Sequence, residues 1–212
     1  MTVLAIGAHH DDIELGAGGT MEKYVRSGDR VYGLVLTNSE THYEIRNIYR
    51  TKEAAVRESQ AASRIIGFSL IDPPEELQSN NGELEYSTGY MRFVEELIHE
   101  HNIDTCLVHW TGDVNTDHAA AAQISIVAAR HVPRVLMYRS NWYQTDRTFN
   151  GTIYTDITEV VDIKTEALRA YAGEIDNRGE DWISTFIEAS RINGFSVGVK
   201  FAEVFAPIRY LA

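Results

Sequence analysis

Short apolar runs alternate with longer amphipathic stretches over the first two-thirds of the chain. Five runs are nearly continuous in apolar residues, as the strands of a buried parallel sheet are, and predict strands at residues 3–8, 31–37, 68–72, 104–110 and 134–139. The stretches between them carry apolar residues at intervals near 3.6 and predict helices at residues 19–27, 49–66, 88–101 and 116–131. This alternation is typical of βαβ units in an α/β fold.

The pattern changes after Ser140. Residues 153–157 predict an extra strand, residues 158–173 and 181–193 predict helices, and residues 199–209 fit a short final strand. No repeat or low-complexity linker marks a boundary, and 212 residues suit one domain. We therefore expect a single domain over residues 1–212, a Rossmann-like three-layer sandwich with a mostly parallel central sheet and a C-terminal extension of helices and a strand.

Composition narrows the class of partner and the cellular compartment. The chain has 31 acidic against 19 basic residues, a formal charge of −12, which is the wrong sign for binding nucleic acid. No apolar run approaches the roughly 20 residues that span a bilayer, and no signal-peptide pattern precedes the first predicted strand. The lone Cys106 excludes an intramolecular disulfide. We expect a cytoplasmic protein without a membrane span.

Four ionisable residues, His9, His10, Asp11 and Asp12, follow the first predicted strand. An open α/β sheet places its ligand site at the carboxyl ends of its strands. A His and an Asp three positions apart can bind one metal ion, which leaves Asp11 to act on a bound water. The glycines at 16, 18 and 19 lack G-x-G-x-x-G spacing and follow acidic residues, so we interpret them as allowing a tight turn and close helix packing.

A second polar cluster, residues 109–118, follows the fourth predicted strand and ends at His118. If the strand order follows the common 3-2-1-4-5 pattern, the first and fourth strands are neighbours and their loops meet. His9, Asp12 and His118 then form a set of two His and one carboxylate, with coordination positions open for water and substrate, as a catalytic zinc site requires. Such a set also accepts Fe²⁺.

Residues 8–20, Ala-His-His-Asp-Asp-Ile-Glu-Leu-Gly-Ala-Gly-Gly-Thr, resemble the signature of the LmbE-like, or PIG-L, family of zinc-dependent N-acetyl-sugar deacetylases. Residues 36–40, 57–58 with Gly67, 113–118 and 202–205 are also similar to family motifs, in the same order. The resemblance implies that His9, Asp12 and His118 bind zinc and that Asp11 is the general base. It implies an N-acetylated amino sugar or conjugate as substrate, and it admits a homo-oligomer.

Two positions depart from the family pattern. His10 stands where the family usually has Pro, and Asn115 stands where several members carry a His that assists the tetrahedral intermediate or the leaving amine. Asn115 is therefore a candidate hydrogen-bond donor to an oxyanion, and His109 is a candidate for proton transfer or for orienting the site.

Other residues at the predicted strand ends are candidates for substrate contact. His42 follows the second strand, and Trp142 and Tyr143 follow the fifth. The alternatives are a solvated loop for His42 and core packing for the two aromatic residues. Arg46 and Arg50 fit either contact with an acidic part of the substrate or an ordinary surface position, and Glu203 fits a structural role.

These residues predict metal-dependent amide hydrolysis. The metal polarises the amide carbonyl and acidifies its water, Asp11 accepts the proton, and acetate and a free amine leave. Two alternatives stay open: hydrolysis of a formyl or other acyl amide of a sugar, and a non-catalytic nucleotide- or sugar-binding module on the same sheet.

Overall fold

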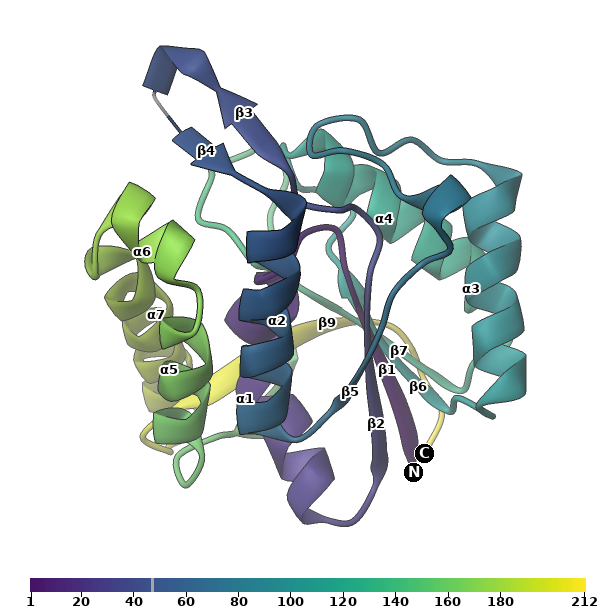
Figure 1. Ribbon diagram of the computed structural model, residues 1–212. Coiled ribbons are helices and arrows are strands. Elements are labelled where there is room, and N and C mark those ends of the chain that lie inside the picture. Colours follow the sequence, from purple (N-terminus) through teal and green to yellow (C-terminus); the bar gives the residue numbers. More distant parts are fainter. Residues whose placement is uncertain (47) are drawn as a thin grey trace.

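A mixed seven-stranded sheet forms the centre of the molecule (Figure 1). The computed structural model describes residues 1–46 and 48–212, without the side chain of Arg46. The strands are β1 (Thr2–Gly7), β2 (Arg30–Val35), β3 (Thr41–Tyr43), β4 (Ile48–Arg50), β5 (Ser69–Ile71), β6 (Thr105–His109), β7 (Arg134–Tyr138), β8 (Ile153–Asp156) and β9 (Ala202–Tyr210). The helices are α1 (Asp12–Arg26), α2 (Lys52–Ile66), α3 (Thr88–Glu100), α4 (Thr116–Ala128), α5 (Val161–Arg169), α6 (Ala172–Arg178) and α7 (Asp181–Val197), with short 3₁₀ turns at Glu44–Arg46 and Glu75–Leu77.

The strand order is β5-β2-β1-β6-β7-β9-β8. The first five strands in this order pair in parallel, and β9 pairs antiparallel with both β7 and β8. The predicted α/β fold is therefore confirmed, and the five parallel strands have the 3-2-1-4-5 order that the sequence analysis assumed. Because β1 and β6 are neighbours, the loops that follow them meet at one edge of the sheet.

Helices cover both faces of the sheet and complete three layers (Figure 1). Alternate residues of β1 face opposite layers, as the two-residue period of a strand requires. Val3 and Ala5 pack in a core with residues of α1, α2, α5 and α7, and Leu4 and Ile6 pack in a second core with residues of α3 and α4. Both faces of β1 are therefore buried, which explains its continuous apolar sequence.

Helix α1 begins at Asp12, seven residues before the predicted start. The glycines expected to make a tight turn lie inside this helix, so that part of the interpretation is wrong. The expected close packing is confirmed, because a Cβ at Gly16 would overlap the Tyr138 ring and one at Gly19 would lie 2.8 Å from Ile157. The helix therefore needs glycine where it packs against β7 and the residue that follows β8, despite the low helix propensity of glycine.

Helix α2 starts three residues later than predicted, because the Thr51 side chain caps its first turn by accepting a hydrogen bond from Ala54 N at 3.2 Å. It ends at Ile66, and Gly67 caps it with the left-handed φ of 96° that favours glycine at this position. Local capping residues therefore set both ends of this helix.

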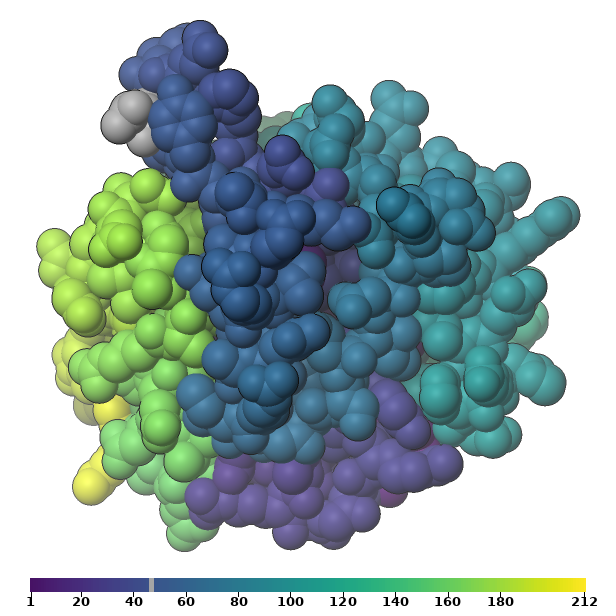
Figure 2. Space-filling model, in the orientation of Figure 1, coloured from purple at the N-terminus to yellow at the C-terminus, as the bar shows by residue number. Residues whose placement is uncertain are grey.

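Helix α6 and the two short strands β3 and β4 are absent from the prediction. The single helix expected at 158–173 ends at Arg169, and α6 follows after a break at Ala170 and Tyr171. The hairpin of β3 and β4 projects from the body of the molecule (Figure 2). Its strands have three residues each and are largely exposed, so they carry no hydrophobic alternation that a sequence pattern could reveal.

Within the described part of the chain, no helix combines the length and the apolar character needed to cross a bilayer.

Candidate metal centre

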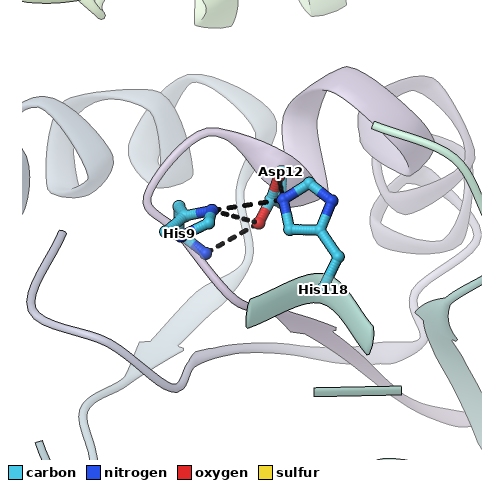
Figure 3. Close-up of side chains that lie close together, drawn as sticks. All are labelled: His9, Asp12 and His118. Carbon is cyan, nitrogen blue, oxygen red and sulfur yellow. Dashed lines mark hydrogen bonds and ion pairs between the residues drawn. The ribbon is translucent and has the colours of Figure 1, made fainter. Parts of the chain in front are cut away.

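Three potential metal ligands converge where the loops after β1 and β6 meet (Figure 3). His9 lies in the loop after β1, Asp12 is the first residue of α1, and His118 lies in the first turn of α4. His9 Nδ1 is 3.2 Å from His118 Nε2, and the Asp12 carboxylate oxygens lie 3.4 Å from His9 Nδ1 and 3.2 Å from His118 Nε2. One ligand atom from each residue can therefore face the same point.

The Asp12 carboxylate is fixed by donors from two strand ends. Oδ2 accepts hydrogen bonds from the backbone N of Ala8 at 3.0 Å and of His9 at 2.7 Å. Oδ1 accepts one from the Ser140 hydroxyl, which follows β7, at 2.7 Å. This carboxylate is 2% exposed, and its orientation is set before any ligand arrives.

Each candidate histidine ligand has a carboxylate at its other ring nitrogen. His9 Nε2 lies 2.7 Å from Asp117 Oδ2, and His118 Nδ1 lies 3.0 Å from Asp113 Oδ2. Metal-bound histidines almost always donate their second N–H in this way, which fixes the ring orientation and raises ligand basicity. Asp113 and Asp117 belong to the motif at residues 113–118, but only the fold shows that they orient the two rings.

The electrostatics of the centre favour a cation. Burial opposes protonation of His9, but hydrogen bonds to Asp117 and Asp12 outweigh it and raise the pKa to about 10. Burial is likewise outweighed at His118, where Asp12 and Asp113 raise the pKa to about 9. The neighbouring carboxylates therefore stabilise positive charge at both rings. The donor set of two imidazoles and one carboxylate, each with its orienting partner, fits a divalent metal such as Zn²⁺.

Asp11 lies beside the three ligands and lines the same cavity. Burial and the neighbouring Asp12 charge raise the pKa of its carboxyl well above the usual range. Its backbone has φ 156° and ψ −23°, a sparsely populated region that folded proteins retain mainly at functional sites. The structure thus places a strained, buried carboxyl group next to the point where the ligands converge.

A cavity of about 120 Å³ opens over these residues, and its walls hold part of the predicted site. Asn115, Trp142 and Tyr143 line it, whereas His42 lies in an adjoining outer groove. His109 is fully buried, 3.1 Å from Asp12 Oδ2, and its ring stacks on His118 at 4.2 Å between centroids. His109 therefore supports the ligands and does not line the cavity.

Asn115 caps helix α4. Its side-chain oxygen accepts hydrogen bonds from the backbone N of Asp117 at 2.9 Å and of His118 at 3.2 Å. An N-terminal cap with this geometry fixes the start of the helix that carries His118. Because the oxygen is engaged, the group that Asn115 can offer to the cavity is its amide nitrogen.

Arg50 is buried and forms hydrogen bonds with three other segments around the loop that follows β1. It donates to Glu58 Oε2 at 2.7 Å, to the His10 carbonyl at 3.2 Å and to Glu174 at 3.4 Å. Neither of the sequence interpretations of Arg50 anticipated this network, because its partners lie up to 124 residues away. The Arg46 side chain lies outside the described part of the chain.

His10, which replaces the usual proline, turns away from the metal ligands. It is buried, its Nδ1 lies 2.8 Å from the Ser39 hydroxyl, and Ser39 also accepts from the His10 backbone N at 2.9 Å. The loop is therefore fixed by hydrogen bonds where a proline would restrict it covalently.

The sequence of this chain matches a known protein family. The PIG-L family model, described as GlcNAc-PI de-N-acetylase, matches residues 4–129, which include all three candidate ligands. The chain belongs to the PIG-L family. The resemblance seen in the sequence is thereby confirmed.

Individual relatives extend the comparison over the whole chain. Uncharacterized deacetylase YaiS of Escherichia coli (strain K12) is 29% identical over 153 residues, 66% of this chain and 75% of that protein. N,N'-diacetylchitobiose deacetylase from Pyrococcus horikoshii has a TM-score of 0.80 at 18% identity, covering 98% of this chain and 83% of its own. GalB, a 4-carboxy-2-hydroxymuconate hydratase from Pseudomonas putida KT2440, has a TM-score of 0.83 at 17% identity, covering 100% and 98%. The two structural similarities show a shared fold.

Proposed function

We propose that this PIG-L family chain is a metal-dependent hydrolase that removes the N-acetyl group from an amino sugar or an amino-sugar conjugate. The observation that carries the proposal is the convergence of His9, Asp12 and His118 beside Asp11 in one cavity. Further support comes from the family description, from the deacetylase name of the Escherichia coli relative and from the Pyrococcus horikoshii enzyme, which is named for a diacetylated sugar.

His9, Asp12 and His118 would hold the metal, with Zn²⁺ as the expected ion and Fe²⁺ as the alternative. When bound, such an ion polarises a carbonyl and lowers the pKa of a coordinated water. Asp11 accepts the water proton as the oxygen attacks the amide carbon, and it returns a proton to the nitrogen of the leaving amine. Its pKa, raised by burial, suits a group that must both accept and donate a proton.

Asn115 and His109 would assist without exchanging protons with the substrate. The Asn115 amide nitrogen is placed to donate a hydrogen bond to the developing oxyanion, because its oxygen is engaged by the helix cap. His109 is fully buried and acts as a positioning residue for Asp12 and His118. Its role is therefore orientation, one of the two roles that the sequence left open.

Substrate contacts would come from the aromatic residues after β7. Trp142 and Tyr143 are 42% and 47% exposed and line the metal cavity, so their rings are available to the apolar faces of a sugar. His42 lies farther out and would contact the part of the sugar or conjugate that extends into the outer groove.

The test is release of primary amine from a panel of N-acetyl amino sugars and their conjugates. Chelator-treated protein is assayed before and after Zn²⁺ is restored, and acetate and formate are measured in parallel. We expect zinc-dependent amine release with an equal amount of acetate. Formate in place of acetate would support the other acyl alternative. Folded, metal-loaded protein that releases no amine from any panel member would contradict the proposal, and GalB shows that this fold also carries out other chemistry.

A further inference from the structure

Two larger grooves open from the metal cavity through different walls. The acyl groove, as we name it, has a volume of about 320 Å³ and is lined in part by Leu15, Trp142, Phe149, Phe186, Ala189 and Val204. The outer groove, about 770 Å³, is lined in part by His42, Asn81, Tyr143, Glu174, Asp176 and Arg178. Among the described residues, none lines both grooves, so a substrate at the metal cavity can extend in two separate directions.

The two grooves differ in chemistry. The lining of the acyl groove combines large apolar side chains, among them Leu15, Trp142 and Phe186, with uncharged polar residues such as Asn141, Gln144 and Asn193. The outer groove carries two acids, a guanidinium and amides, which suit the hydroxyl groups of a sugar. Leu15, Trp142 and Asn141 line both the metal cavity and the acyl groove, so the passage between the two has two apolar side chains and one amide.

Two of the charged residues that line the acyl groove, Glu203 and Lys164, are already paired with each other. Glu203 accepts hydrogen bonds from the backbone N of Gly19 at 2.9 Å and of Thr20 at 2.7 Å, and from Lys164 Nζ at 2.6 Å. Lys164 also donates to the Leu15 carbonyl at 2.8 Å. An apolar chain in the groove would therefore leave Glu203 and Lys164 with their partners. Arg139, the third charged residue of the lining, donates to the Tyr143 carbonyl at 2.9 Å and lies over the Trp110 ring.

A secondary amide places its acyl chain and its amine on different sides of the reacting carbonyl. A sugar in the outer groove therefore directs the acyl chain towards the acyl groove. We infer that the groove lined by Leu15, Trp142, Phe186 and Ala189 binds the acyl part of the substrate, and that this chain hydrolyses N-acyl amino sugars with chains several carbons longer than acetyl. This inference rests on the proposed function.

The volumes support a chain longer than acetyl. The metal cavity, at about 120 Å³, corresponds to roughly four waters of the liquid, which leaves little room beyond the reacting group. The acyl groove is more than twice as large and is not needed for a methyl group. In the reaction the C–N bond breaks, the water oxygen joins the acyl carbon, and the amine nitrogen takes the proton, so a carboxylate of the same chain length leaves.

The first measurement compares kcat/KM for N-acetyl-, N-butanoyl- and N-hexanoyl-glucosamine with the zinc-loaded enzyme. We expect the two longer substrates to be hydrolysed at least as efficiently as the acetyl compound, with the corresponding carboxylate released in equal amount. A tenfold or greater preference for acetyl over hexanoyl would overturn the inference while leaving the proposed function intact.

A second measurement does not depend on catalysis. Binding of acetate, butanoate and hexanoate to chelator-treated protein is measured by saturation-transfer NMR or calorimetry. Full burial of one CH₂ strengthens binding about fourfold. Ala189 and Trp142 are exposed, so we expect each additional CH₂ of the ligand to be about half buried. The four extra CH₂ groups of hexanoate should then give roughly tenfold tighter binding than acetate.

Variants of one helix locate the binding. Ala189 lines the groove, so Ala189→Phe should fill it and lower the hexanoyl-to-acetyl ratio of kcat/KM and the affinity for hexanoate at least tenfold. Ser184→Phe is the matched control, because Ser184 is exposed on the same helix and lines neither groove. Equal effects of both variants, or none from Ala189→Phe, would overturn the inference. Hexanoate binding that Ala189→Phe removes, in a protein that hydrolyses no amide, would confirm the groove and reject the proposed function.

Discussion

Two buried charged clusters contact helix α1, and they differ in how their polar atoms are used. At its N-terminus, ligand atoms of His9, Asp12 and His118 face a common point and line a cavity. Farther along, Glu203 and Lys164 direct their polar atoms at each other and at the α1 backbone. Burial and charge are similar, so what separates a candidate reaction centre from a structural brace is whether ligand atoms are left facing one point.

The comparison predicts that changes in the first cluster reduce activity and changes in the second reduce stability. Asp11→Asn keeps the size of the side chain and suits an unusual backbone conformation, because Asn tolerates positive φ better than most residues. We expect kcat/KM to fall by about 10⁴-fold, the upper range for a lost general base. Metal content and the free energy of unfolding should stay near wild type. Metal analysis and urea denaturation provide the controls, and retained turnover would remove Asp11 from the mechanism.

Lys164→Met applies the converse test to the second cluster. It leaves the Glu203 carboxylate buried without its cation, which should lower the free energy of unfolding by about 4 kcal/mol. Zinc affinity of the folded variant should change little. The double variant Lys164→Met with Glu203→Leu removes both charges and should recover much of the loss. If the single variant were as stable as wild type by urea denaturation, the structural interpretation of this pair would be wrong.

Asp117→Asn sharpens the interpretation of the first cluster. It weakens the hydrogen bond at His9 Nε2 without removing a candidate ligand. Loss of such an orienting carboxylate typically lowers metal affinity 10–100-fold, and we expect a loss in that range by competition with a zinc chelator. Asp176→Asn is a control, because Asp176 lines only the outer groove. Equal affinities for both variants would argue against the orienting role.

The smallest expected effect is a pH dependence confined to the metal-free protein. The folded-state pKa values of His9, about 10, and His118, about 9, exceed the ordinary value of 6.5. Stability from protonating these rings is fully present below pH 6.5 and is lost as pH rises through the folded-state values. We expect the free energy of unfolding of the metal-free protein to fall as the pH rises from 6.5 to 8.5. With Zn²⁺ bound, the rings hold metal in place of protons, and the same urea titrations should show a flatter profile.

The strand pattern and the three candidate ligands follow from the sequence, because both depend on local signals. Apolar runs mark buried strands, and polar residues directly after β1 and β6 lie at one edge once the strand order is assumed. Asp12 and His118 therefore meet as predicted, although 106 positions separate them in the sequence.

The parts that the sequence did not reveal depend on partners that no local pattern identifies. The orienting role of Asp117 requires that His9, 108 residues away, turn its Nε2 toward it. The Arg50 network joins a strand end, a loop carbonyl and two helices. Helix α1 was placed too late because its glycines indicate a turn by propensity, whereas contacts with Tyr138 and Ile157 keep them helical.

The contact between Gly16 and Tyr138 also has an evolutionary consequence. The Tyr138 ring fills the space that a side chain at position 16 would take, and its hydroxyl donates to the Ile6 carbonyl at 2.8 Å. A larger residue at position 16 alone would clash with Tyr138, and a smaller residue at position 138 alone would leave a void between α1 and the sheet. The two positions should therefore have changed together over the history of the family, and any descendant with a side chain at position 16 should carry a smaller residue at position 138.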